Sequence, residues 1–133
     1  MNHATKKDIR SREDLVQILN VFYQKAFADE LIGDFFTKVI PLNLETHMPL
    51  ITDFWESVVL NTQGYRKNVM EIHQHINQLS KINKNHLDRW VELFTGTIDE
   101  LFAGEKAILM KQRARSIATL MEIKFNHKQI NKP

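Results

Sequence analysis

Apolar residues recur along this chain at intervals of three and four, and this spacing limits the possible folds more than any other feature of the sequence. Because an α-helix completes a turn in 3.6 residues, such spacing places the apolar side chains on one helix face. Four glycines and three prolines in 133 residues leave few turn residues for a many-stranded sheet. We therefore expect an all-α protein with one globular domain over residues 12–127, a flexible arm at 1–11 and a flexible tail at 128–133.

Local signals suggest where the helices begin and end. Ser11 starts a capping-box pattern ahead of a helix expected at about 12–28, and a second helix should begin after residue 43 with Pro49 in its first turn. Asn85 is the expected N-cap of a long helix that Gly104 closes. The last amphipathic pattern runs from about 105 to 126.

Composition excludes several classes of function. The chain has no cysteine, which rules out disulfides, thiolate nucleophiles and cysteine-bound zinc or iron–sulfur centres. A formal charge of only +2 gives no basic field for a nucleic-acid partner, so none is expected. The longest stretch without a charged side chain, from Ser57 to Tyr65, is too short to span a membrane. No signal peptide is visible at the N-terminus, so we expect a cytoplasmic protein without a membrane partner.

Four side chains with polar tips fall on the inward faces of the predicted helices: Tyr23, His47, His73 and Trp90. Each must find a hydrogen-bond partner in the interior or leave a costly unpaired group. One interpretation is that they are ordinary core residues with their own partners. The other is that they line one cavity around a flat apolar cofactor with iron at its centre. The spacing alone leaves both open.

The sequence also resembles a known family over roughly residues 12–125, with the motifs in matching order and spacing. The motifs are Leu15-Val-x-x-Leu-x-x-Phe22-Tyr23, Leu31-Ile-Gly-Asp-Phe35-Phe36, His47-Met-Pro-x-Ile51-x-x-Phe54-Trp55, Met70-x-x-His73, His86-Leu-x-Arg89-Trp90-x-x-Leu93-Phe94 and Ala118-x-x-Met121. This set is similar to that of the group III truncated haemoglobins. The resemblance implies a shortened globin fold, with two helix pairs packed two over two around haem b (protohaem IX with its iron).

The resemblance implies a role for each matching residue. His73 matches the proximal ligand and the single protein ligand to a five-coordinate iron, and His75 should face away from the pocket. Tyr23, His47 and Trp90 match the distal pocket, where His47 is either a gate or a further hydrogen-bond donor. Contacts to haem are expected from Phe36, Ile51, Phe54, Tyr65, Arg66, Lys67, Met70, His73, Ile76, Trp90 and Phe94.

The implied function is binding of dioxygen, carbon monoxide, nitric oxide or peroxide at the haem iron. Two distal donors hold dioxygen rather than deliver it, which favours ligand activation, sensing or detoxification over simple transport. Nitric oxide dioxygenase-like or peroxidase-like activity would need an electron donor, a reductase of unknown identity. The alternative is a helical ligand-binding or interaction module without haem, in which the aromatic residues are plain core.

Overall fold

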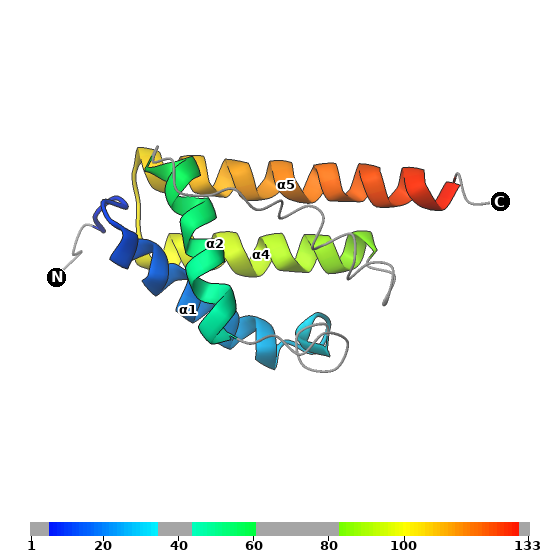
Figure 1. Ribbon diagram of the computed structural model, residues 1–133, viewed down its shortest axis with the longest axis horizontal. Helices are drawn as coiled ribbons and strands as arrows, with labels where there is room; N and C mark the ends of the chain where they lie inside the picture. Colours follow the sequence, from blue (N-terminus) through cyan, green and yellow to red (C-terminus); the bar gives the residue numbers. More distant parts are fainter. Residues whose placement is uncertain (1–5, 35–43, 61–82, 131–133) are drawn as a thin grey trace, which may run out of the picture.

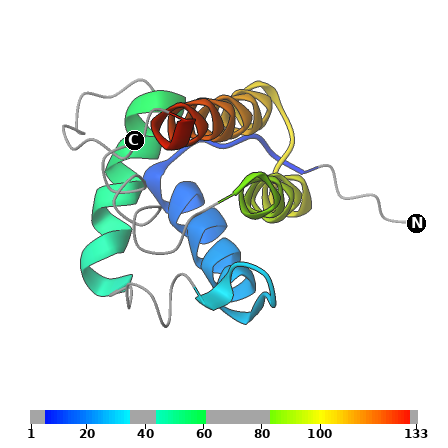
Figure 2. The same ribbon diagram turned by 90° about the vertical axis from the view of Figure 1, so that its right-hand side faces the viewer.

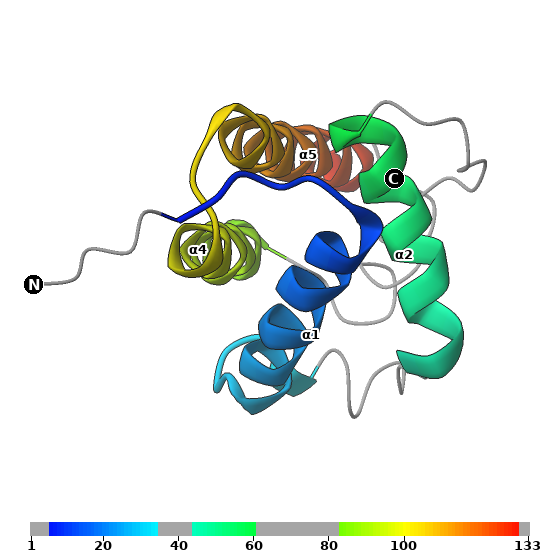
Figure 3. The same cartoon turned by 90° about the vertical axis from the view of Figure 1, so that its left-hand side faces the viewer.

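The structure, a computed structural model, describes residues 6–34, 44–60 and 83–130, with side chains as far as Lys124. These residues form four helices and no strand: α1 (Arg12–Ala28), α2 (Leu44–Val59), α4 (Lys84–Leu101) and α5 (Glu105–Ile130). Helices α4 and α5 lie side by side and antiparallel, and α2 crosses over α1 (Figure 1). Views along the long axis show the α1–α2 pair against the α4–α5 pair, with the core between them (Figures 2 and 3). The expected all-α, two-over-two architecture is confirmed.

Helix α1 has the predicted bounds. The Ser11 side chain accepts a hydrogen bond from the Asp14 backbone N–H, as the N-cap of the predicted capping box should. The Asp14 carboxylate accepts a hydrogen bond from the backbone N–H of Arg10 at 2.9 Å. Burial alone would raise the pKa of Asp14, but hydrogen bonds from Arg10 and Lys7 outweigh burial and lower it.

Helix α2 begins directly after residue 43, as predicted, but the predicted position of Pro49 within it was wrong. The helix starts at Leu44, so Pro49 lies inside it and not in its first turn, and Pro49 has no N–H to donate to the carbonyl four residues earlier. The apolar spacing of Leu50, Ile51 and Phe54 predicts one inward face for this helix, and the observed inward face is slightly rotated from it. Leu50 is 40% exposed, whereas Thr52 is 1% exposed and its hydroxyl donates to the Met48 carbonyl at 2.6 Å. This local hydrogen bond lets a polar residue occupy a core position.

Helix α4 is capped by Asn83, two residues before the expected Asn85. The Asn83 side chain accepts from the backbone N–H of His86, and Nδ1 of His86 accepts from the backbone N–H of Asn83. At the other end α4 stops at Leu101, and Gly104 stands at the start of α5 instead of closing α4, with its carbonyl accepting from Ile108 N–H. The boundary prediction chose the wrong one of two nearby asparagines, because either residue type can cap a helix that starts directly after it.

The N-terminal segment is packed onto the body from residue 6 onward, which differs from the flexible arm expected at 1–11. Ile9 is 1% exposed and belongs to the hydrophobic core. The Asp8 carboxylate accepts hydrogen bonds from the backbone N–H groups of Lys106 and Ala107, both at 3.0 Å, at the N-terminus of α5. Burial tends to raise the pKa of Asp8, but these bonds lower it overall.

Helix α5 packs on α4 through small and flexible side chains, as its pattern predicted. The buried residues are Ala107, Met110, Ala114, Ala118 and Met121. Three of the five are alanines, which lets the backbones of α4 and α5 approach closely. The helix continues to Ile130, beyond the predicted end at 126 and into the tail expected at 128–133. None of the helices in the described ranges has both the length and the apolar character needed to cross a bilayer.

Candidate functional site

The crossing of α1 and α2 brings two of the predicted site residues into direct contact. The Tyr23 hydroxyl oxygen lies 2.6 Å from Nε2 of His47, and the two rings meet edge to face with centroids 5.4 Å apart. Tyr23 is only 7% exposed, and His47 is half-buried at the edge of the core. The pair therefore forms a buried polar spot on the inner side of the α1–α2 layer.

Burial determines the charge state of this pair. Desolvation of the phenolate raises the pKa of Tyr23 far above its ordinary value. Desolvation of the imidazolium lowers the pKa of His47 below its ordinary value. At neutral pH a neutral phenol therefore faces a neutral imidazole, with one proton between oxygen and nitrogen. Either the phenol donates to Nε2, or an imidazole with its hydrogen on Nε2 donates to the phenol oxygen.

Aromatic rings surround the polar pair and continue into the core. Phe22 meets Tyr23 edge to face at 5.0 Å, and it meets Phe94 in the same way at 5.1 Å. Phe94 in turn stacks with Trp90 and with Trp55, each with centroids 5.2 Å apart. This packing explains why Phe94, a predicted haem contact, is 1% exposed as part of the core.

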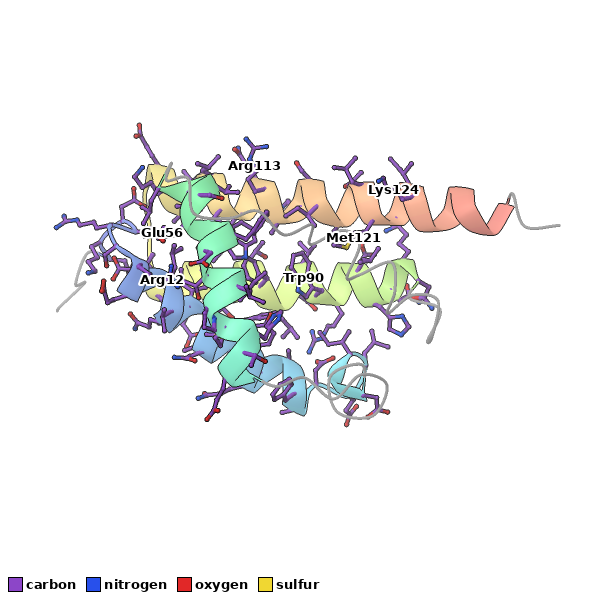
Figure 4. The ribbon with its side chains drawn as sticks, in the orientation of Figure 1. Arg12, Glu56, Trp90, Arg113, Met121 and Lys124 are labelled. Carbon is purple, nitrogen blue, oxygen red and sulfur yellow. The ribbon has the colours of Figure 1, made fainter. Side chains whose placement is uncertain are left out.

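Trp90 is half-buried and bridges two parts of the interior. It packs against the main core and also against the small cluster of Leu87, Ala118 and Met121 between α4 and α5. Figure 4 shows Trp90 and Met121 in this region. Trp90 contacts Phe22 edge to face at 6.3 Å, which places it near the aromatic shell of the Tyr23–His47 pair.

The other predicted site residues fall into two groups. Ile51 and Phe54 are half-buried on α2 and pack against the core. The remaining ones lie outside the described residues: Phe36, Tyr65, Arg66, Lys67, Met70, His73 and Ile76. The described ranges contain no group of three or more His, Cys, Asp or Glu side chains that could hold a metal ion on their own.

An arginine that the sequence analysis did not single out holds α2 in position. The Arg12 guanidinium bonds Asp53 at 2.6 Å and Glu56 at 2.9 Å, and it also donates to the Pro49 carbonyl at 3.5 Å. Figure 4 shows Arg12 of α1 beside Glu56 of α2. The clamp fixes the helix that carries His47. The two acidic residues three apart on α2 were a weak signal for this clamp. Their partner Arg12 lies 41 and 44 positions away, so the sequence did not indicate it.

A second long-range pair joins α1 to α4 near Trp90. The carboxylate of Asp29, the C-cap of α1, is 6% exposed and pairs with Arg89 at 2.7 Å. It also accepts from the backbone N–H groups of Leu31 and Ile32, which ends α1 and turns the chain. The bond from Arg89 is the largest cause of the lowered pKa of Asp29, because a neighbouring cation favours the carboxylate.

Comparison with known proteins gives one relative in sequence and one in structure. No family model matches the chain. The chain is 24% identical over 112 residues to a curated group 3 truncated hemoglobin of Campylobacter jejuni, covering 82% of this chain and 86% of the relative.

The structural relative is a crystal structure of the group III truncated hemoglobin from Campylobacter jejuni. It aligns with a TM-score of 0.76 at 20% identity, over 91% of this chain and 95% of the other. The resemblance seen in the sequence motifs is thus confirmed: the chain has the truncated globin fold and is similar in sequence to a group III truncated haemoglobin.

Proposed function

We propose that this protein binds haem b and uses it to bind dioxygen and other small diatomic ligands. The observation that carries the proposal is the buried Tyr23–His47 pair, 2.6 Å apart, in an otherwise aromatic interior of truncated globin fold. Polar groups that converge inside a mostly apolar shell are what a site for a small polar ligand requires. In the proposed arrangement His73 would hold the haem iron, and the iron would bind the small ligand.

The described residues fit such a cofactor. A haem is a flat, mostly apolar group, and Ile51, Phe54 and Trp90 supply half-buried apolar surface around the polar pair. A haem iron needs only one protein ligand, so it does not require the cluster of acidic and histidine side chains that a bare metal ion needs. When bound, haem would supply the iron at which dioxygen, carbon monoxide, nitric oxide or peroxide binds.

The distal residues act through hydrogen bonds. A His47 with hydrogen on Nε2 donates to the Tyr23 oxygen and directs the phenol O–H into the pocket. A ligand with partial negative charge then gains about 1.5–3 kcal/mol from that donor. In the proposed pocket the indole N–H of Trp90 is a second donor. Two donors of this strength retain the ligand, which favours ligand activation, sensing, or detoxification of nitric oxide or peroxide over transport. A detoxification reaction would take its electrons from a reductase.

The haem assignment is tested by absorption spectroscopy of the purified protein and of two histidine variants. The wild-type protein should be red and show a Soret band, with spectral shifts on reduction and on addition of carbon monoxide. His73→Ala should lose stoichiometric haem or hold it weakly until imidazole is added, because the axial ligand is gone. His75→Ala is the matched control, two positions away, and should retain haem normally.

Two outcomes would contradict the proposal. A colourless protein that does not take up added haem would favour a helical ligand-binding or interaction module without haem. A His73→Ala variant with normal haem content and an unchanged ferrous spectrum would refute His73 as the ligand while leaving haem binding intact.

A further inference from the structure

We propose that Tyr23 and His47 form a one-electron redox site, in which the phenol loses an electron and passes its proton to Nε2 of His47. The geometry required for this step is present. The phenol oxygen and Nε2 are 2.6 Å apart, so the proton moves within an existing hydrogen bond and needs no water.

The proposed step removes one electron and one proton from the phenol of Tyr23. The O–H bond of Tyr23 breaks, an N–H bond to His47 forms, and one electron leaves to an oxidant. The products are a neutral phenoxyl radical and an imidazolium. A phenol that has lost an electron is a strong acid, so oxidation is favourable only where a base takes the proton in the same step. At neutral pH the imidazole is unprotonated and able to do so.

The surroundings of the pair protect a radical once it has formed. Tyr23 is 7% exposed, so solvent reductants have little access to the ring. The ring centroids of Phe22 and Phe27 lie 5.0 Å and 6.1 Å from that of Tyr23. Phenylalanine rings are much harder to oxidise than a phenol. The half-buried position of His47 lets water solvate part of the new positive charge, which a fully buried site would not.

This step uses the opposite tautomer from ligand binding. Here Nε2 accepts from the phenol, whereas in the ligand-bound state Nε2 donates to it. The natural oxidant would be a haem iron oxidised by hydrogen peroxide, and that part rests on the proposed function. The redox pair itself belongs to the polypeptide and can be tested without haem.

The experiment oxidises the haem-free full-length chain with photogenerated tris(bipyridine)ruthenium(III), an outer-sphere oxidant. Transient absorption measures the rate of radical formation, and electron paramagnetic resonance of frozen samples identifies the radical. The chain has only two tyrosines, so Tyr65→Phe is a matched control for Tyr23→Phe. The long-lived tyrosyl signal should persist in Tyr65→Phe and disappear in Tyr23→Phe. In His47→Gln it should form at least about tenfold more slowly, which corresponds to about 1.4 kcal/mol.

A kinetic isotope comparison needs no variant and covers the case in which a variant misfolds. In the wild-type protein the formation rate should fall in D₂O, because the proton moves together with the electron. A tyrosyl signal that survives in Tyr23→Phe, a correctly folded His47→Gln that reacts at the wild-type rate, or a rate unaffected by D₂O would each overturn the proposal. None of these results depends on haem, so failure of the redox pair is distinct from failure of the haem assignment.

Discussion

Replacing Asp8 by alanine should lower the stability of the whole domain, although Asp8 lies outside every helix. Its carboxylate accepts from the backbone N–H groups of Lys106 and Ala107 in the first turn of α5, about a hundred residues away in sequence. Loss of an N-terminal capping side chain costs about 1–2 kcal/mol. Loss of the negative charge at a helix N-terminus adds about 0.3–1 kcal/mol. The expected decrease in the free energy of unfolding is therefore about 2 kcal/mol.

Two further variants serve as comparisons for Asp8→Ala. Asp8→Asn keeps one acceptor oxygen but loses the charge and the acceptor for one of the two N–H groups. It should therefore cost nearly as much as Asp8→Ala, about 1–2 kcal/mol. Asp88→Ala is the control, because Asp88 is 59% exposed and, within the described residues, forms its ion pair with Lys84, one turn earlier in the same helix. Surface changes of that kind stay within about 0.5 kcal/mol.

Urea unfolding followed by circular dichroism measures the free energy of unfolding of all three variants. Thermal unfolding provides a second measurement. In a domain of this size, each kcal/mol lost from the free energy of unfolding should lower Tm by roughly 3–5 °C. If Asp8→Ala were as stable as Asp88→Ala, the N-terminal segment would not hold the start of α5, and the reasoning would be wrong. A deletion of residues 1–5 should leave stability nearly unchanged if the effect belongs to the Asp8 carboxylate.

Three other predictions follow from the core, the carboxylates and the pocket. Phe94→Ala should lower the free energy of unfolding by about 3–5 kcal/mol, because the ring is fully buried among other aromatic rings. If urea unfolding gave a loss below about 1.5 kcal/mol, the surrounding side chains would have collapsed into the cavity. The pKa values of Asp8, Asp14 and Asp29 are all lowered by folding, so their stabilisation is complete above about pH 4 and is lost as the pH falls through the lowered values. Urea unfolding between pH 7 and pH 3 measures this, and a flat profile would contradict it. In the haem-bound protein, Tyr23→Phe should raise the dioxygen dissociation rate at least about tenfold in stopped-flow experiments and change carbon monoxide binding much less. Equal effects on the two ligands would indicate that Tyr23 acts through packing and not through a hydrogen bond.

The sequence was sufficient for several features that depend on neighbours within a turn or two, although it placed the N-cap of α4 two residues too late. The bounds of α1, its Ser11 cap and the turn at Asp29 involve contacts over four residues or fewer, which a linear pattern contains. The helical spacing that predicts inward positions for Tyr23 and His47 also depends only on nearby residues of one helix. The structure confirms both positions. The chemistry of His73 and of the other residues outside the described ranges remains a prediction from motifs.

Only the tertiary structure determined the features that depend on contacts between segments far apart in the sequence. Asp8 belongs to the segment expected to be a flexible arm, but its carboxylate accepts hydrogen bonds from backbone N–H groups at the start of α5. Leu50 is exposed and Thr52 is buried because burial depends on the rotation of α2 against α1, which the Arg12 clamp helps to hold. The 2.6 Å bond between Tyr23 and His47 likewise arises from the crossing of two helices. Periodicity gives the face on which a side chain lies, but packing of the whole chain determines what that side chain meets there.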